Sequence, residues 1–265
     1  SQYNARLEYT HFQTGPIVHK PSYTYSRGFD LALLYSQDSY QRARDEVINP
    51  RGGRKISFRY DRYLNFFLDG FEYAGFLREK YKRYPYDSFY LNWIERIPVP
   101  GTAKHTLQVR GQTAIIDRWV DSFYENQLGG PAQMRGYTYY SLSGRKTLMA
   151  QALYRFPILY DVNKSMPVFH FNHMFMGLFA DAGRAWNDGD ITWTGKGFKR
   201  DLGAELRFDV ISFSNLPTMI EFSTAWGPDD TWIKKLDPET SVMRVVKDTQ
   251  DPWKFYFNIL FGFTQ

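Results

Sequence analysis

The chain contains no cysteine, no long apolar run and no cluster of Lys and Arg. The missing cysteines exclude disulfides, cysteine-ligated zinc and thiol catalysis. No segment approaches the ~20 consecutive apolar residues that a membrane-spanning helix needs. The net charge of +5 comes from 33 basic and 28 acidic residues without a basic block, so nucleic acid is not predicted as a partner.

Aromatic residues are abundant instead, at 18% of the 265 residues. They comprise 22 Phe, 20 Tyr and 7 Trp. A soluble domain would bury such residues in its core, whereas a transmembrane barrel places them in girdles at the two membrane interfaces. The mean hydropathy of −0.50 is compatible with a barrel, because every second strand residue faces a polar lumen.

The sequence starts at Ser1 without an initiator Met or the apolar core of a signal peptide. We therefore expect a processed or truncated chain. The length fits one large all-β domain, so residues 1–265 are assigned to a single domain.

Period-two alternation of apolar and polar residues predicts strands throughout the chain. The clearest case alternates Leu202, Ala204, Leu206 and Phe208 with charged neighbours such as Asp201 and Glu205. The ten predicted strands lie near residues 3–10, 28–35, 55–61, 89–96, 107–115, 145–156, 172–185, 199–211, 217–227 and 254–264. No comparable helical period occurs.

Connections of alternating length favour a membrane barrel over a soluble β-sandwich or propeller, which would also show half-buried strands. Short turns are predicted at 98–103 and 213–216, and long loops at 69–86, 118–143, 187–196 and 228–252. Short turns on one side and long loops on the other are typical of outer-membrane barrels. The sequence therefore predicts an all-β, antiparallel transmembrane β-barrel.

Three motifs, in this order, resemble a known family. They are Gly129-Gly130 followed by Met134-Arg135-Gly136-Tyr137, then Leu153-Tyr154-Arg155-Phe156-Pro157, then the segment from Gly177 to Trp186. They are similar to the C-terminal barrel of the BamA/TamA/FhaC superfamily of outer-membrane assembly and secretion proteins, the bacterial surface antigen family. The resemblance implies a sixteen-strand barrel in the bacterial outer membrane, of which about ten strands are present here. The upstream strands and a periplasmic module would be missing from this chain.

The resemblance also implies a function without covalent catalysis or cofactors, in which the barrel assists the assembly or secretion of other proteins. Its implied partners are outer-membrane lipid, client or secreted proteins, and accessory periplasmic proteins or lipoproteins. Three alternatives stay open. The barrel could anchor a fused propeller or patatin-type enzyme, act as a plain diffusion porin, or be a soluble β-sandwich.

In this family the loop with the Arg-Gly-Tyr motif folds into the lumen. The resemblance pairs Arg135 with Asp181, gives Gly136 close backbone approach, and packs Tyr137 on the lumen wall. Replacing Arg135 should therefore be more damaging than replacing Arg145. The family often has Glu where this chain has Leu153, so another acceptor for Arg135 is expected. The candidates are Gln151, Glu205 and Glu221.

The last strand resembles the C-terminal strand by which outer-membrane proteins are recognised, and it would meet the first strand at the barrel seam. Its seam residues are Phe255, Phe257, Phe261, Gly262 and Phe263. An unpaired strand edge can template another strand. The five histidines lack metal-ligand spacing, and no Gly-x-Ser-x-Gly or Walker loop occurs, so neither a metal site nor an enzyme is predicted.

Overall fold

The computed structural model describes residues 2–12, 23–40, 52–73, 77–102, 104–160, 162–167, 169–189, 197–213, 216–229, 231–236, 243–248 and 251–261. Within these residues the chain is all-β, and none of them forms a helix. In particular, no helix there is long and apolar enough to cross a membrane.

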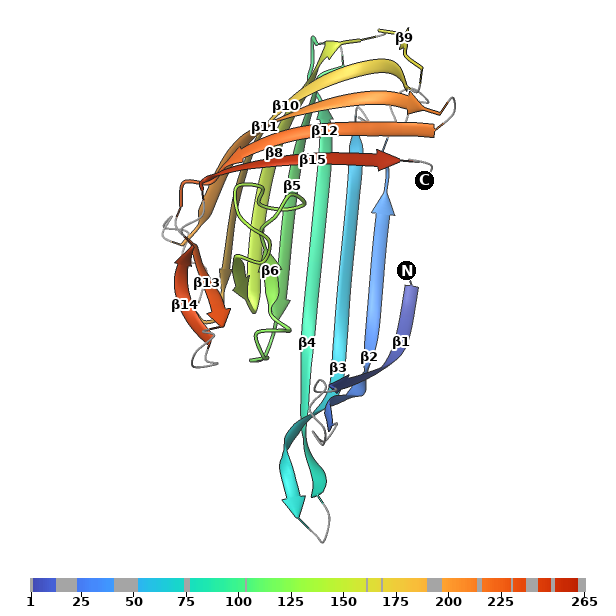
Figure 1. Ribbon diagram of the computed structural model, residues 1–265. Helices are drawn as coiled ribbons and strands as arrows, with labels where there is room; N and C mark the ends of the chain where they lie inside the picture. Colours follow the sequence, from blue (N-terminus) through green and yellow to red (C-terminus); the bar gives the residue numbers. More distant parts are fainter. Residues whose placement is uncertain are drawn as a thin grey trace.

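One large antiparallel sheet dominates the fold (Figure 1). Its strands follow one another in chain order, each pairing with the next. They are β1 (Gln2–Phe12), β2 (Tyr23–Asp38), β3 (Gly53–Tyr73), β4 (Leu77–Pro98), β5 (Thr106–Ile116), β8 (Lys146–Leu159), β10 (Phe169–Trp186), β11 (Lys199–Ser212), β12 (Leu216–Trp226) and β15 (Trp253–Phe261). The short β9 (Lys164–Ser165) adds to β10. This order confirms the ten predicted strands and their antiparallel meander.

The sheet is strongly curved but open (Figure 1). β1 and β15 are the two ends of the strand order, and no pairing joins them among the described residues. A segment between β5 and β8 lies on the concave side of the sheet, and it includes the short pair β6 (Asn126–Leu128) and β7 (Leu142–Gly144).

Strands occur within three of the predicted long loops. The expected loop 118–143 contains the three-residue β6, and two other loop predictions are wrong because they contain longer strands. The expected loop 69–86 is largely the distal half of the β3–β4 hairpin, which includes a stacked Tyr63–Tyr86 pair with ring centroids 4.6 Å apart. Pro85 lies beyond Ser88, where β5 stops pairing with β4, so this part of β4 is an edge that tolerates proline. The expected loop 228–252 contains the hairpin of β13 (Thr231–Leu236) and β14 (Met243–Asp248).

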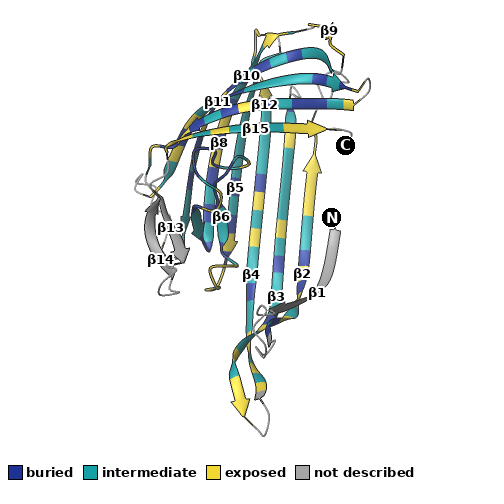
Figure 2. Cartoon of the chain, viewed as in Figure 1, coloured by how far each residue is buried: buried dark blue, intermediate teal, exposed yellow. Residues whose placement is uncertain are grey.

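One face of the sheet exposes apolar side chains, and the other face buries charged ones. Large apolar side chains on one face are exposed, for example Leu178 at 47%, Leu202 at 53% and Phe257 at 56%. The alternate positions turn to the concave face, where the carboxylates of Asp181 and Glu205 are buried. Figure 2 shows buried positions recurring along β10, β11 and β12 and exposed stretches on β2 and β15. We call the apolar side the outer face.

Candidate functional site

A tight loop brings the Arg135-Gly136-Tyr137 tip onto the concave face. Gly129 and Gly130 adopt φ values of 119° and 88°, a backbone region that favours glycine. The Gly130 N–H donates to the Tyr137 carbonyl at 2.9 Å, which closes residues 130–137 into the loop tip. Met134 is fully buried in a cluster with Leu128, Tyr137 and Met149, so the loop tip is packed against β8 as well as hydrogen-bonded.

The Arg135 guanidinium is buried and paired. Its Nη1 donates to Glu205 Oε2 at 2.8 Å, and its Cζ lies 4.0 Å from the centroid of the Phe179 ring. A guanidinium suits this place because it can hydrogen-bond a carboxylate and stack on an aromatic face at the same time. The loop tip is thereby attached to β10 and β11 through one side chain.

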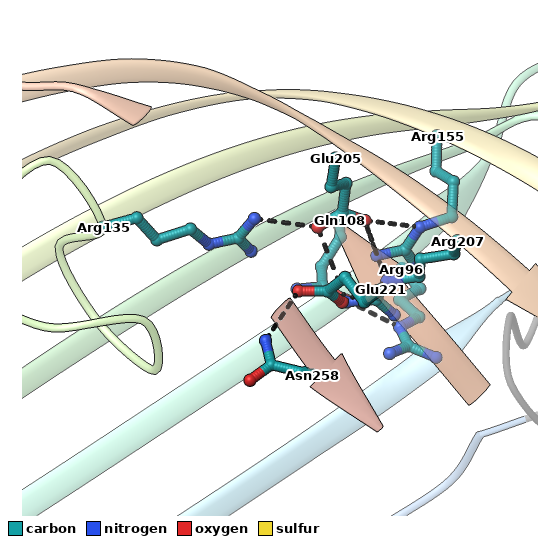
Figure 3. Close-up of polar contacts among 8 residues, drawn as sticks. All are labelled: Arg96, Gln108, Arg135, Arg155, Glu205, Arg207, Glu221 and Asn258. Carbon is teal, nitrogen blue, oxygen red and sulfur yellow. Dashed lines mark hydrogen bonds and ion pairs between the residues drawn. The ribbon is translucent and has the colours of Figure 1, made fainter. Parts of the chain in front are cut away.

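Glu205 joins three arginines (Figure 3). Arg155 of β8 donates from Nε to Oε1 at 2.9 Å and also contacts this oxygen through Nη2. Arg207 Nε forms an ion pair with the same oxygen at 3.2 Å. Gly177 makes room for the glutamate, because a Cβ at this position would lie 2.6 Å from Glu205 Cγ.

The network continues to the last strand. Arg207 Nε pairs with Glu221 Oε2 of β12 at 2.6 Å, and Asn258 Nδ2 of β15 donates to Glu221 Oε1 at 3.4 Å. Buried charges are tolerated only when they are paired and hydrogen-bonded. The chain of contacts therefore fixes β8, β11, β12 and β15 against one another and against the loop tip.

The backbone at Gly136 comes closer to the sheet than a side chain would allow. Its N–H donates to Asp201 Oδ2 at 3.0 Å, and an added Cβ would lie 2.5 Å from Asp201 Cβ and 2.9 Å from Gly227 Cα. Glycine is required here for space, as the sequence predicted.

Tyr137 reaches the end of β11. Its phenol donates to the Arg200 carbonyl at 2.6 Å and lies 3.2 Å from Asp229 Oδ2. Burial, and then the nearby Asp229 carboxylate, raise the pKa of the Tyr137 phenol well above its usual value. The phenol therefore stays protonated and remains a donor at physiological pH.

Two further hydrogen bonds hold the main chain of the loop tip. Tyr256 of β15 donates its phenol proton to the Arg135 carbonyl at 2.7 Å, and Arg110 Nη1 of β5 donates to the Ala132 carbonyl at 2.7 Å. The sequence did not indicate these contacts. The alternation of apolar and polar residues does predict that the side chains of Tyr256 and Arg110 lie on the concave face, but not which atoms they contact there.

The predicted partner of Arg135 was wrong. Arg135 pairs with Glu205, one of the three alternative acceptors, and not with Asp181. Asp181 is buried opposite Asp201 in the β10–β11 register, and no ion pair joins it to Arg135 among the described residues. Gln151 lies opposite Asp181 and does not hydrogen-bond Arg135, while Glu221 joins the network only through Arg207.

Leu153, at the position where the family often has Glu, is buried with Phe179 and Ala225. It supports the ring on which the Arg135 guanidinium stacks. The acid is thus supplied from β11, while Leu153 contributes packing.

Arg145, the residue with which Arg135 was to be compared, is itself held by the fold. It is buried, donates from Nη2 to the Asn187 carbonyl at 2.7 Å, and lies 4.7 Å from the centroid of the Trp119 ring. Arg118 is the better control, because its side chain is 52% exposed and its ion pair with Asp117 is long at 3.8 Å.

The predicted seam strand carries exposed aromatics on the outer face of β15. They are Phe255, Phe257 and Phe261. Gly262 and Phe263 lie outside the described residues. Within the described part of the chain, no three His, Asp or Glu side chains are grouped as a metal site would require.

Comparison with protein-family models and with curated proteins gave no match to this chain.

Proposed function

We propose that this chain is the C-terminal part of a sixteen-strand transmembrane β-barrel in the bacterial outer membrane, which assists the assembly or secretion of other proteins. One observation carries the proposal. The Arg135-Gly136-Tyr137 tip is held on the concave face by Glu205, Asp201 and the Arg200 carbonyl. A loop pinned inside a barrel by a buried arginine is the feature that the resemblance implies.

The inverted polarity of the sheet supports the membrane part of the proposal. Exposed Leu and Phe on the outer face match a lipid environment, and buried charges on the concave face match a polar lumen. A water-soluble sheet would place these two sets the other way round.

The network also supports a role for the loop tip in keeping the strands in register. Through Glu205 it binds β8 and β11, and through Tyr256 it binds β15, the edge strand of the sheet. An edge held in a fixed place can accept an extended client segment by β-augmentation. We infer that the loop tip positions this edge for such pairing.

The test compares Arg135→Ala with Arg118→Ala in the full-length protein. Arg135→Ala removes one of the positive charges that pair with the buried Glu205 carboxylate. Breaking a buried ion pair lowers the free energy of unfolding by about 3–5 kcal/mol. We expect it to lower the temperature at which the folded barrel loses its heat-modifiable gel migration, and to lower the outer-membrane protein content of cells that depend on it. Equal and negligible effects of the two substitutions would overturn the proposal.

Planar-bilayer conductance separates the proposal from a diffusion porin. A lumen occupied by the loop tip predicts small and infrequent openings in the wild type and larger steady openings in Arg135→Ala. A large steady conductance of the wild type would favour the porin.

A further inference from the structure

A groove of about 530 Å³ crosses the outer face of the sheet. Its floor is formed by small side chains on three neighbouring strands, so the sheet backbone is nearly bare there. These residues are Val109, Ala150, Ala152, Ala180 and Ala182. The register places Ala180 beside Ala152 and Ala182 beside Ala150, which makes the depression continuous from strand to strand.

Leu202 and Trp226 form one wall of this groove. They are direct cross-strand partners on β11 and β12, and both are exposed on the outer face. The volume lies within the range of about 300–1,000 Å³ typical of small-molecule sites, whereas protein interfaces are broader and flatter. The apolar lining suits a hydrocarbon chain and offers little to the polar backbone of a peptide.

Basic side chains lie at one end of the groove. Arg200 lines it directly and is the register partner of Ala182. The main-chain N–H of Arg200 donates to Asp229 Oδ2 at 2.8 Å, but no ion pair holds its guanidinium among the described residues. On the same face and at the same end, Lys146 Nζ donates to the Gly189 carbonyl at 3.4 Å and Arg184 lies over the Trp186 ring.

We propose that this groove binds one acyl chain of a membrane lipid with a negatively charged headgroup, which Arg200 contacts. The inference rests on the proposed membrane location of the sheet. An apolar slot that ends at a cation is complementary to an anionic amphiphile, with the chain on the alanine floor and the headgroup at the basic end. A neutral lipid would match only the slot.

The test uses the full-length protein in neutral detergent and native mass spectrometry with dimyristoyl phosphatidylglycerol or dimyristoyl phosphatidylcholine. One basic contact at an anionic surface corresponds to about a fivefold preference for the anionic lipid. Arg200→Gln should reduce this preference to near one, and Arg83→Gln, an exposed arginine on β4, should not. An equal affinity of the wild type for both lipids would overturn the headgroup contact.

A second pair of variants tests the slot itself. Ala180→Phe fills the groove from an exposed position. It should weaken the binding of both lipids by about tenfold, since it occupies the place of the acyl chain. Leu33→Phe, on the outer face of β2, should leave both unchanged. Retained heat-modifiable migration shows that each variant is folded, and unchanged binding by Ala180→Phe would overturn the proposal.

Flotation of the wild type with lipid vesicles separates this inference from the proposed function. A folded protein that fails to float contradicts the membrane location. A protein that floats but shows neither lipid preference nor sensitivity to Ala180→Phe contradicts only the lipid site.

Discussion

Glu205 is the central residue of the charge network at the site. Its carboxylate forms ion pairs with Arg135, Arg155 and Arg207. We expect Glu205→Gln to destabilise the folded protein by about 3–5 kcal/mol, because it leaves a buried guanidinium without its charge partner. Thermal unfolding in detergent, followed by gel migration, measures the loss.

Glu95→Gln is the matched control for that substitution. Glu95 is paired with Arg54 at 2.5 Å, but the arginine is 51% exposed, and such surface pairs contribute only about 0–1 kcal/mol. If both variants unfold at the same temperature, the Glu205 network does not stabilise the fold.

Gly136→Ala tests the close approach of the loop tip to β11. The added methyl group would overlap Asp201 and Gly227, and overpacking of this kind costs about 1–3 kcal/mol. We expect faster protease cleavage within residues 130–137. Gly111→Ala provides the comparison, because its Cβ would meet only a Trp93 ring carbon at an ordinary 3.7 Å; equal cleavage of the two variants would contradict the required contact.

For individual residues, the sequence predicted that the loop tip is buried and that Gly136 is needed, but not which acid pairs with Arg135. Asp181 and Glu205 both turn to the concave face, so alternation could not choose between them. The choice depends on side-chain length and on the space above Gly177, which is a property of the assembled sheet.

β15 depends on the loop tip for part of its attachment. Tyr256→Phe removes the hydrogen bond to the Arg135 carbonyl and should cost about 0.5–1.5 kcal/mol. We expect faster amide hydrogen exchange in β15, which has only β12 as a neighbour in the described sheet. Tyr35→Phe, which loses an exposed 3.3 Å bond to Gln37, should change exchange little; a similar response of β15 to both would count against the coupling.

Strand positions were predictable because each strand has one apolar and one polar face, a pattern that needs no tertiary information. Strand ends were less so. The distal β3–β4 hairpin was predicted to be a loop, whereas a bulge next to Gly70 and an unpaired edge at Pro85 allow the two strands to continue there.

For the molecule as a whole, the inverted faces lead to a test of its environment. Leu178→Arg, at mid-strand on the outer face, should destabilise a membrane-inserted barrel by about 2–4 kcal/mol. In water the same substitution of an exposed residue would change the free energy of unfolding by no more than about 0.5 kcal/mol. Leu159→Arg, at the end of β8, should cost about 0–1 kcal/mol in a membrane. Unfolding measured in lipid vesicles distinguishes the cases, and equal costs at the two positions would exclude a depth-dependent lipid environment.

The contacts of Arg135 also have an order in time. The residue is synthesised before every partner that holds it, with Glu205 70 positions later and Tyr256 121 positions later. Contacts between residues so distant in sequence form slowly, because the intervening chain must first be ordered. The Arg135 carbonyl gains its phenol donor only once β15 has been made and placed, so this contact of the loop tip forms only after β15 has joined the sheet.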